Sequence, residues 1–168
     1  MISKSLSDDK PVGVIGAGNF GSAVANLLAQ HRNVLLYARD EKVIRRIEQT
    51  RENRGHPMHA NIRFTNDLAR IATECEVIFP IVPSQHFRVL MKQLSPYLHP
   101  YHILIHGTKG FDIKLAEGQT LETVSELNRE QVKTISEVIR EESVVVRVGC
   151  LAGPNLAKEL AAGQPAAT

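Results

Sequence analysis

Runs of apolar residues alternate with amphipathic stretches along nearly the whole chain. The apolar runs are typical of strands buried on both faces, and they lie at Val12–Ile15, Val34–Tyr37, Val77–Val82, Ile103–His106 and Val144–Val148, with a weaker one at Ile62–Thr65. The stretches between them predict helices at Ser22–Gln30, Glu41–Glu52, Asp67–Thr73, Gln85–Leu94, Arg129–Glu141 and Asn155–Ala162. Strands that alternate with helices through short links predict right-handed crossovers, and therefore an α/β fold with a doubly wound parallel sheet.

Polar residues and irregular stretches mark the boundaries of these elements. Asn66 and Ser84 each precede a predicted helix and are expected to be its N-cap. Two stretches lack periodicity, residues 53–61 and Phe111–Asn128, and we interpret them as loops, the second as an insertion on the surface.

The most informative segment is Val12–Ala23, in which an apolar strand turns through three spaced glycines into a helix. In this pattern Gly16 makes the tight turn, Gly18 lets the backbone approach a pyrophosphate, and Gly21 lets the helix pack closely on its strand. The first helical N–H groups, from about Asn19 onward, would then face an anion. The segment therefore predicts a Rossmann-type dinucleotide-binding site.

Small, polar and cationic residues follow the other predicted strands. These segments are Ala38–Asp40, Val82–Ser84, Gly107–Gly110 and Gly153–Asn155. Because ligands of open parallel sheets bind outside the carboxyl ends of the strands, we expect these segments to meet at one cleft.

The end of the second strand bears on the choice of cofactor. NAD-selective sites usually place an acid here to accept a hydrogen bond from the ribose 2′-hydroxyl. Arg39 could stack on adenine and pair with a 2′-phosphate, whereas Asp40 could serve the hydroxyl or cap the helix that begins at Glu41. The pattern favours NADPH, or use of both nucleotides, over strict use of NADH.

Two further segments carry candidate chemistry. Lys109 lies between small residues after an apolar strand, where its ammonium could bind a phosphate or a carbonyl oxygen; the alternative is a surface lysine. Pro154 fits the first turn of the last predicted helix, whose free N–H groups and Asn155 amide form a second polar edge. Lys158 and Glu159 are expected to point outward.

Composition limits the classes of function. The chain has 168 residues and a net charge of +2 with both signs interspersed, which predicts one globular domain and argues against nucleic-acid or membrane partners. It has no signal peptide and no transmembrane stretch, so a cytoplasmic protein is expected. Cys75 and Cys150 are expected to be reduced, buried and inert, and His56 and His59 to be solvated loop residues and not metal ligands.

Four motifs together resemble the bacterial type of NAD(P)-dependent sn-glycerol-3-phosphate dehydrogenase over nearly the whole chain. They are Gly16–Gly21, Ile81–Ser84, Gly107–Gly110 and Gly153–Leu160. The glycine motif occurs in many dehydrogenases, whereas the Thr-Lys-Gly and Gly-Pro-x-x-Ala-x-Glu elements are more specific.

The resemblance implies roles for individual residues. It implies that Asn19, Phe20 and Arg39 bind the dinucleotide with Ala157 nearby, in addition to the three glycines and Pro83 already placed at the strand ends. It also implies that Lys109 touches both cofactor and substrate, and that Gly153 and Asn155 line the glycerol phosphate site. Two departures stand out: Asn155 replaces the family's usual Ser or Thr, and Phe111–Asn128 is longer than usual.

The family also has a helical C-terminal domain that supplies the catalytic lysine and most of the grip on the substrate phosphate. We therefore expect residues 1–10 to be a flexible tail and 11–168 to be a coenzyme-binding domain truncated near Gly163–Thr168, with no catalytic residue of its own. The enzyme would reduce dihydroxyacetone phosphate reversibly to sn-glycerol 3-phosphate for phospholipid synthesis, and any homodimer would form through the missing domain. The alternatives are a ketopantoate or hydroxyacid reductase, and a non-catalytic NAD(P) sensor.

Overall fold

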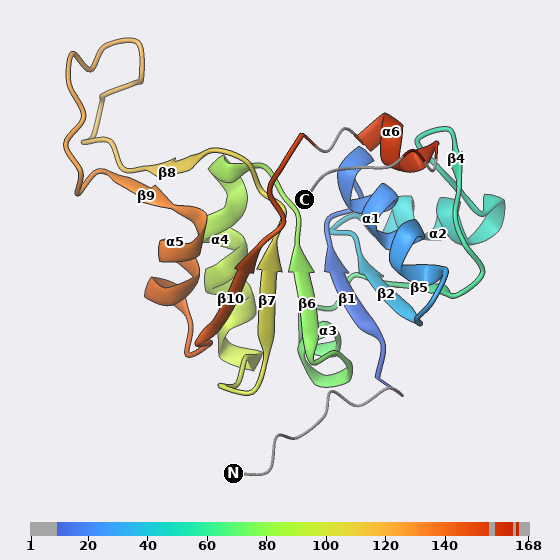
Figure 1. Cartoon of the computed structure of the whole chain (residues 1–168). Coiled ribbons are helices and arrows are strands. Elements are labelled where there is room, and N and C mark those ends of the chain that lie inside the picture. The colour runs from blue at the N-terminus through green and yellow to red at the C-terminus, as the bar shows by residue number, and fades with distance from the viewer. Residues whose placement is uncertain (1–9, 155–156, 163, 165–168) are drawn as a thin grey trace.

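A parallel sheet of six strands runs through the computed structural model, which describes residues 10–154, 157–162 and 164 (Figure 1). The strands are β1 (Val12–Ile15), β2 (Val34–Tyr37), β5 (Ile62–Thr65), β6 (Val77–Pro80), β7 (Ile103–His106) and β10 (Arg147–Cys150), in the order β10-β7-β6-β1-β2-β5. The chain builds outward from β1 in one direction and from β6 in the other, so the order reverses between them. The predicted doubly wound parallel sheet is confirmed, and the reversal is where such sheets bind ligands.

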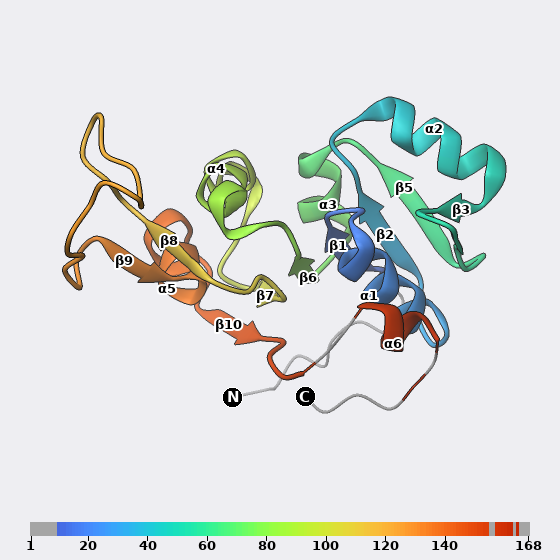
Figure 2. The ribbon, with the colours of Figure 1, turned by 90° about the horizontal axis from the view of Figure 1, so that it is seen from above.

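Helices cover the sheet from both sides (Figure 2). They are α1 (Asn19–Ala29), α2 (Glu41–Thr50), α3 (Leu68–Glu74), α4 (Ser84–Leu94), α5 (Ile135–Glu142) and α6 (Ala157–Ala161), with a short 3-10 turn at Ser95–Tyr97. Helix α1 lies on one face, with α6 packed against it, while α3, α4 and α5 lie on the other face and α2 packs at the β5 edge.

The sheet divides the apolar core into two clusters. Val14 and Leu36 point into the cluster that contains residues of α1 and α2, whereas Ile15 and Leu35 point into the cluster formed with α3, α4 and α5. All four are fully buried, because alternate side chains of a strand face opposite sides. Burial on both faces is therefore confirmed for β1 and β2, but it is wrong for β10, whose four residues are partly or fully exposed.

Helices α1 and α2 each differ from prediction by more than one residue at one end. Helix α1 begins at Asn19, three residues earlier than predicted, because the Ser22 N–H already donates to the Gly18 carbonyl over 2.9 Å. Helix α2 ends at Thr50 and not at Glu52, because Arg51 adopts a left-handed conformation (φ 53°) that terminates it.

The two predicted N-caps are both wrong by one residue. In α3 the cap is Asp67, whose carboxylate accepts a hydrogen bond of 2.8 Å from the Ala69 N–H, and not Asn66. In α4 Pro83 occupies the cap position without a side-chain hydrogen bond, so Ser84 is the first helical residue. Asp40 does cap α2, accepting from the Lys42 N–H over 2.8 Å.

The stretch around the expected insertion contains an antiparallel hairpin. Strand β8 (Phe111–Ile113) pairs with β9 (Val132–Thr134), so the first part of the helix predicted at Arg129–Glu141 is wrong. Helix α5 begins only after Thr134, which closes a reciprocal capping box with Glu137. The residues between the two strands form the arm that projects beside α4 and α5 in Figure 1.

The loop expected at 53–61 contains a second, shorter hairpin. Its strands are β3 (Glu52–Asn53) and β4 (His56–Pro57), which pair antiparallel. Pairing between segments that are close in the chain but lack alternation leaves no periodic signal.

Three strand boundaries and one cysteine also require correction; one of the three is the end of β10, which lies at Cys150 and not at Val148. Strand β6 ends at Pro80, two residues early, and β10 begins three residues later than predicted, since Val144 and Val146 are exposed. Cys150 is exposed, so its predicted burial is wrong. Cys75 is buried as predicted, and desolvation raises the pKa of its thiol to about 12.

Several expectations fall outside the described residues. They are the tail at 1–9, Asn155 with the start of the last predicted helix, and most of Gly163–Thr168. Within the described part of the chain, no helix is both long and apolar enough to cross a membrane.

Candidate functional site

The three glycines after β1 have separate structural roles. Gly16 has φ of +121°, and a Cβ built there would stand 2.1 Å from the Ile81 carbonyl oxygen. A Cβ on Gly21 would stand 1.9 Å from the Gly16 carbonyl oxygen, so the start of α1 presses directly on the turn. Gly18 is different, because nothing lies within 4 Å of its missing Cβ. Gly16 and Gly21 are thus required by packing, while Gly18 faces open space into which a ligand can come close.

The N-terminus of α1 is left open to an anion. Gly18 is its N-cap and provides no side-chain hydrogen bond, and the first turn contains no acidic residue. The unpaired N–H groups and the positive end of the helix dipole therefore have no counter-charge from the helix itself.

A cleft of about 380 Å³ lies between this helix N-terminus and the ends of β6 and β7. It brings together seven of the predicted site residues: Gly18, Asn19, Phe20, Gly21, Pro83, Lys109 and Ala157. Gly16 lies beneath it, against Ile81.

The cleft is also lined by Ile81, Val82, Gly107 and Thr108. Sequence reasoning placed the last three in segments expected to meet at this cleft, but it gave none of the four a role of its own. A Cβ on Gly107 would lie 3.0 Å from Cε1 of Phe20, so the glycine makes room for that ring. The presence of a glycine at this position was a signal in the sequence, but only the fold shows that the Phe20 ring packs on it.

Thr108 and Lys109, which follow β7, contact the segments that follow β6 and β10. The Thr108 hydroxyl donates to the Val82 carbonyl over 2.7 Å, and the Lys109 Nζ donates to the Gly153 carbonyl over 3.5 Å. Lys109 lines the cleft and also a neighbouring cavity of about 500 Å³, which Gly153 lines as well. The predicted meeting of Lys109 with Gly153 is thus observed, whereas Asn155 lies outside the described residues.

The far wall of this second cavity contains a histidine–serine pair that sequence reasoning missed. His106 is 5% exposed, and its Nε2 shares a hydrogen bond of 2.9 Å with the Ser136 hydroxyl at the start of α5. Desolvation lowers the His106 pKa, and the nearby Thr108 backbone offsets this only in part. The His106 Nδ1 has no hydrogen-bond partner of good geometry. The imidazole is therefore neutral near pH 7, which leaves the Lys109 ammonium as the charged group lining this cavity.

Arg39 lies beside the glycine turn but does not line the cleft. It follows Tyr37, whose carbonyl accepts a hydrogen bond of 3.0 Å from the Gly16 N–H. Because the Asp40 carboxylate already caps α2, the acid next to Arg39 is engaged in the fold. Within residues 10–154, Arg39 forms no ion pair, so its guanidinium is available to a ligand.

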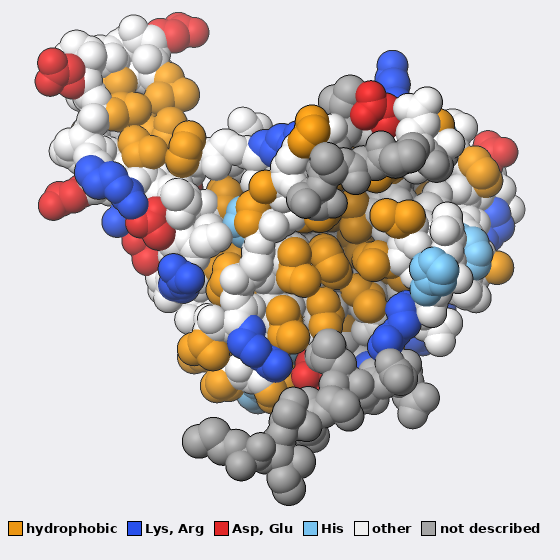
Figure 3. Space-filling model, viewed as in Figure 1, with side chains coloured by type: hydrophobic (Ala, Val, Ile, Leu, Met, Phe, Trp, Pro, Cys, Tyr) orange, Lys and Arg blue, Asp and Glu red, His pale blue; other side chains and the backbone are white. Residues whose placement is uncertain are grey.

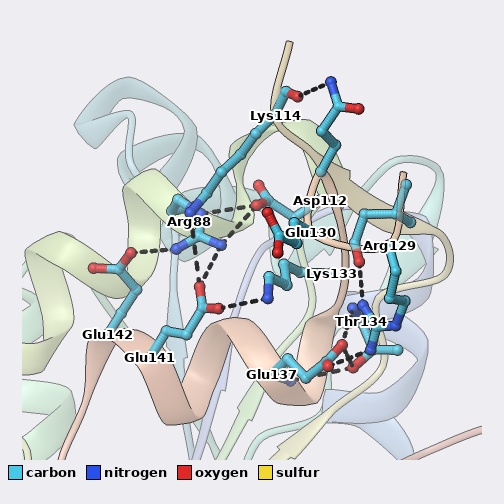
Figure 4. Close-up of polar contacts among 12 residues, drawn as sticks. Arg88, Asp112, Lys114, Arg129, Glu130, Lys133, Thr134, Glu137, Glu141 and Glu142 are labelled. Atoms are coloured by element: carbon cyan, nitrogen blue, oxygen red, sulfur yellow. Dashed lines mark hydrogen bonds and ion pairs between the residues drawn. The ribbon is translucent and has the colours of Figure 1, made fainter. Parts of the chain in front are cut away.

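The segment after Lys109 is anchored by a partly buried ion cluster (Figure 4). The guanidinium of Arg88, on α4, donates to Asp112 on β8 and to Glu141 on α5 over 2.8 Å each, and also to Glu142. Burial alone would lower the Arg88 pKa, but the three carboxylates outweigh it and raise the pKa. The cluster joins the base of the arm to two helices, and so holds the strand that follows Gly110.

The family of NAD-dependent glycerol-3-phosphate dehydrogenase N-termini matches residues 11–168. The chain belongs to this family. Glycerol-3-phosphate dehydrogenase [NAD(P)+] of Saccharophagus degradans is 35% identical over 165 residues, which cover 95% of this chain and 42% of that protein. The chain therefore spans about two fifths of the length of this curated relative.

Solved structures agree with the family at the level of the fold. The glycerol-3-phosphate dehydrogenase of Coxiella burnetii has a TM-score of 0.73 at 25% identity, over 94% of this chain and 45% of that one. A ketopantoate reductase from Ralstonia eutropha shares the fold less closely, with a TM-score of 0.59 at 16% identity over 83% of this chain and 40% of that one. The glycerol-3-phosphate dehydrogenase family accounts for nearly the whole chain, as the motifs predicted.

Proposed function

We propose that this chain binds NAD(P)H and is the coenzyme-binding part of an NAD(P)-dependent glycerol-3-phosphate dehydrogenase. The observation that carries the proposal is the cleft itself, in which an uncapped helix N-terminus and Lys109 face the same space across the reversal of the strand order. The open position at Gly18 fits the close approach of a pyrophosphate, and the Phe20 ring supplies an apolar wall.

The reaction we assign is reversible hydride transfer between NAD(P)H and dihydroxyacetone phosphate, which gives sn-glycerol 3-phosphate. The bound nicotinamide supplies the hydride. Lys109 would hold the substrate from the side of Gly153, because its ammonium lines both cavities and can attract a carbonyl or phosphate oxygen. The predicted binding residues, including Asn155, keep these roles as part of the proposal.

The curated relatives are more than twice as long as this chain, and we propose that the catalytic lysine and the phosphate-binding groups lie outside these 168 residues. The 168-residue chain should then bind the nucleotide without catalysing the reaction. A calorimetric titration of the chain should show binding of NADPH and NADH, and an absorbance assay with dihydroxyacetone phosphate should show no turnover, because hydride transfer needs the carbonyl held and polarised beside the ring. Turnover by the chain alone would contradict this division.

Gly18→Ala is a sharp test of the cofactor site. The added methyl enters open space, so stability should be unchanged, while the affinity for both nucleotides falls because the backbone no longer admits the pyrophosphate closely. Unchanged affinity would move the dinucleotide away from this turn.

Lys109→Met tests the substrate side, and it belongs in the longer enzyme to which we assign this domain. We expect kcat/KM for dihydroxyacetone phosphate to fall by about a hundredfold or more, the range for loss of a charge-stabilising donor. The fold should be intact, since the side chain lies at a strand end. Normal kinetics would make Lys109 a surface lysine, and would favour the alternatives of another reductase or a nucleotide sensor.

The wider setting forms the last part of the proposal. We place the enzyme in the cytoplasm, where its product would supply glycerophospholipid synthesis, and we assign any homodimer to residues outside this chain. Lipid labelling in a strain that lacks the gene tests the first point. Sedimentation of the 168-residue chain, which should be monomeric, tests the second.

A further inference from the structure

Arg54 occupies an unusual position at the tip of the hairpin formed by β3 and β4. Asn53 pairs with His56, so Arg54 and Gly55 make a two-residue turn in which both have positive φ, 52° and 80°. Such turns favour glycine and asparagine, and an arginine in the left-handed region is uncommon. A backbone outlier of this kind invites a functional explanation.

The hairpin is fixed to the glycine turn by its neighbouring residue. Asn53 is 1% exposed, and its Nδ2 donates to the Ala17 carbonyl over 3.0 Å and to the Ser22 hydroxyl over 2.8 Å. Ala17 lies between the first two glycines of the motif, and Ser22 lies in the first turns of α1. The position of Arg54 relative to the dinucleotide turn is therefore set by a buried amide.

The rest of the loop is held equally firmly. The Asn26 side chain, on α1, donates to the Pro57 carbonyl over 2.8 Å and accepts from the His59 N–H over 3.0 Å. The Arg51 guanidinium donates to two carbonyls of this loop and to the first carbonyl of β5, and it lies 5.4 Å from the centre of the Phe64 ring. The hairpin thus presents Arg54 from a preorganised support.

The guanidinium of Arg54 lies over the glycine turn, and its positive charge is not neutralised by a described carboxylate. Its Nε is 3.4 Å from the Ala17 carbonyl oxygen, and in the described part of the chain no carboxylate pairs with it. Arg39, which follows β2, likewise forms no ion pair within residues 10–154. Arg54 thus lies over the turn from the hairpin, and Arg39 belongs to the segment that follows Tyr37, whose carbonyl accepts from the Gly16 N–H. The nearest acid in sequence to Arg39, Asp40, is engaged as a helix cap.

We propose that Arg54 is a specificity-determining residue that binds the 2′-phosphate of NADPH together with Arg39. This proposal rests on the cofactor site proposed above. A 2′-phosphate is a dianion on the adenosine ribose, the part of a dinucleotide that Rossmann-type sites place at the end of the second strand. Two guanidinium groups suit a doubly charged phosphate because each can donate two parallel hydrogen bonds.

Arg54→Asn is the decisive variant, because asparagine tolerates the left-handed conformation and keeps the turn. Calorimetric titrations of the chain with NADPH, NADH, adenosine 2′,5′-bisphosphate and adenosine 5′-monophosphate separate the phosphate from the rest of the nucleotide. We expect binding of the two 2′-phosphorylated compounds to weaken by about ten- to a hundredfold, the range for a lost hydrogen bond to a charged group, with NADH and adenosine 5′-monophosphate unaffected. Arg54→Lys should restore part of the loss.

Arg46→Asn is the matched control, since Arg46 is an exposed arginine on α2 and should leave all four affinities unchanged. Urea unfolding should show Arg54→Asn to be as stable as the parent chain, which separates binding from folding. Equal losses for NADPH and NADH would overturn the proposal by assigning Arg54 to the pyrophosphate or adenine, and no loss at all would overturn it too. A parent chain that binds neither dinucleotide would instead refute the cofactor site.

Discussion

The two halves of the sheet are built differently. Strands β1, β2 and β5 pack against α1 on one face and α3 on the other, and Arg63 is the one exposed residue of these three strands. In β6 and β7 alternate residues are only partly buried, because the face opposite α4 and α5 has less cover: these are Val77, Phe79, Ile103 and Ile105. Figure 3 shows hydrophobic side chains gathered at the centre of this face. Apolar packing on both faces therefore stabilises the first half, while the second half relies more on the contacts made at its ends.

The interactions that hold the ligand-binding edge in place also differ between the two halves. In the first half the glycine turn is held by steric contacts with no spare room. In the second, the segment after Lys109 is held by the ion cluster around Arg88 and by the cap of α5. Contacts of the first kind resist salt and pH, whereas those of the second kind respond to both.

Gly16→Ala should have the largest effect on stability. The new Cβ would meet a backbone carbonyl at 2.1 Å in a residue with φ of +121°, so both overlap and backbone strain oppose folding. We expect a loss of about 3 kcal/mol or more, from overpacking and conformational strain together. Urea unfolding measures it, with Gly18→Ala as the matched control that should be neutral. Equal stabilities would mean that the turn is looser than its contacts indicate.

Arg88→Ala should come next. The Arg88 side chain is 15% exposed, and its removal leaves three carboxylates without their shared partner. The expected loss is about 2 kcal/mol, between the values for exposed and fully buried pairs. Arg45→Ala removes an exposed pair with Glu41 on α2 and should cost less than about 0.5 kcal/mol. High salt should reduce the difference between these variants; a difference that survives would point to lost packing of the arginine stem.

Thr134→Ala should cost about 1 kcal/mol, the usual effect of losing an N-cap. It also links stability to pH, because hydrogen bonds from Thr134, backbone first, and from Arg129 hold the Glu137 pKa at about 2. A carboxyl with a lowered folded pKa adds stability that is complete above its unfolded pKa and is lost as the pH falls through the folded value. NMR titration of Glu137 should show a higher pKa in the variant, and an unchanged pKa would contradict the capping box.

Val146→Ser should have the smallest effect, below about 0.5 kcal/mol, because Val146 is 73% exposed just before the edge strand β10. Val14→Ser, in fully buried β1, should cost several times more by burying a hydroxyl in an apolar cluster. Thermal unfolding of the pair compares the two halves directly. A large effect at Val146 would show that this edge is covered in solution.

The success of sequence reasoning follows this division only in part. Strands β1, β2, β5 and β7 begin and end at the predicted residues, because a short apolar run between turn signals has few alternatives. The sequence predicts the start of β10 three residues too early, because Val144 and Val146 are apolar and yet exposed. The sequence predicts helix where β9 lies, because the partner strand is about twenty residues earlier and pairing across a loop leaves no period in the chain.

At the site, motifs located the residues near the glycine turn but not the support behind them. Gly16, Gly18 and Gly21 follow a pattern whose spacing encodes their roles. The structure confirms the tight turn at Gly16 and the close packing at Gly21, and it leaves open space at Gly18. Asn53 and Arg54 lie in a stretch that looks like an ordinary loop. Their importance comes from contacts with Ala17, more than thirty residues away in sequence, which no local pattern records.

The anchoring of the arm by Arg88 has a consequence for variation in length. Because the ion cluster fastens the base of the hairpin to α4 and α5, the residues beyond Lys114 can change in number while the sheet keeps its geometry. Lengthening a flexible connection is inexpensive, since doubling it costs only about 0.6 kcal/mol of closure entropy. The tip, where Leu121 is exposed, is therefore the natural place to graft a tag, a fluorophore or a short peptide without disturbing the nucleotide cleft.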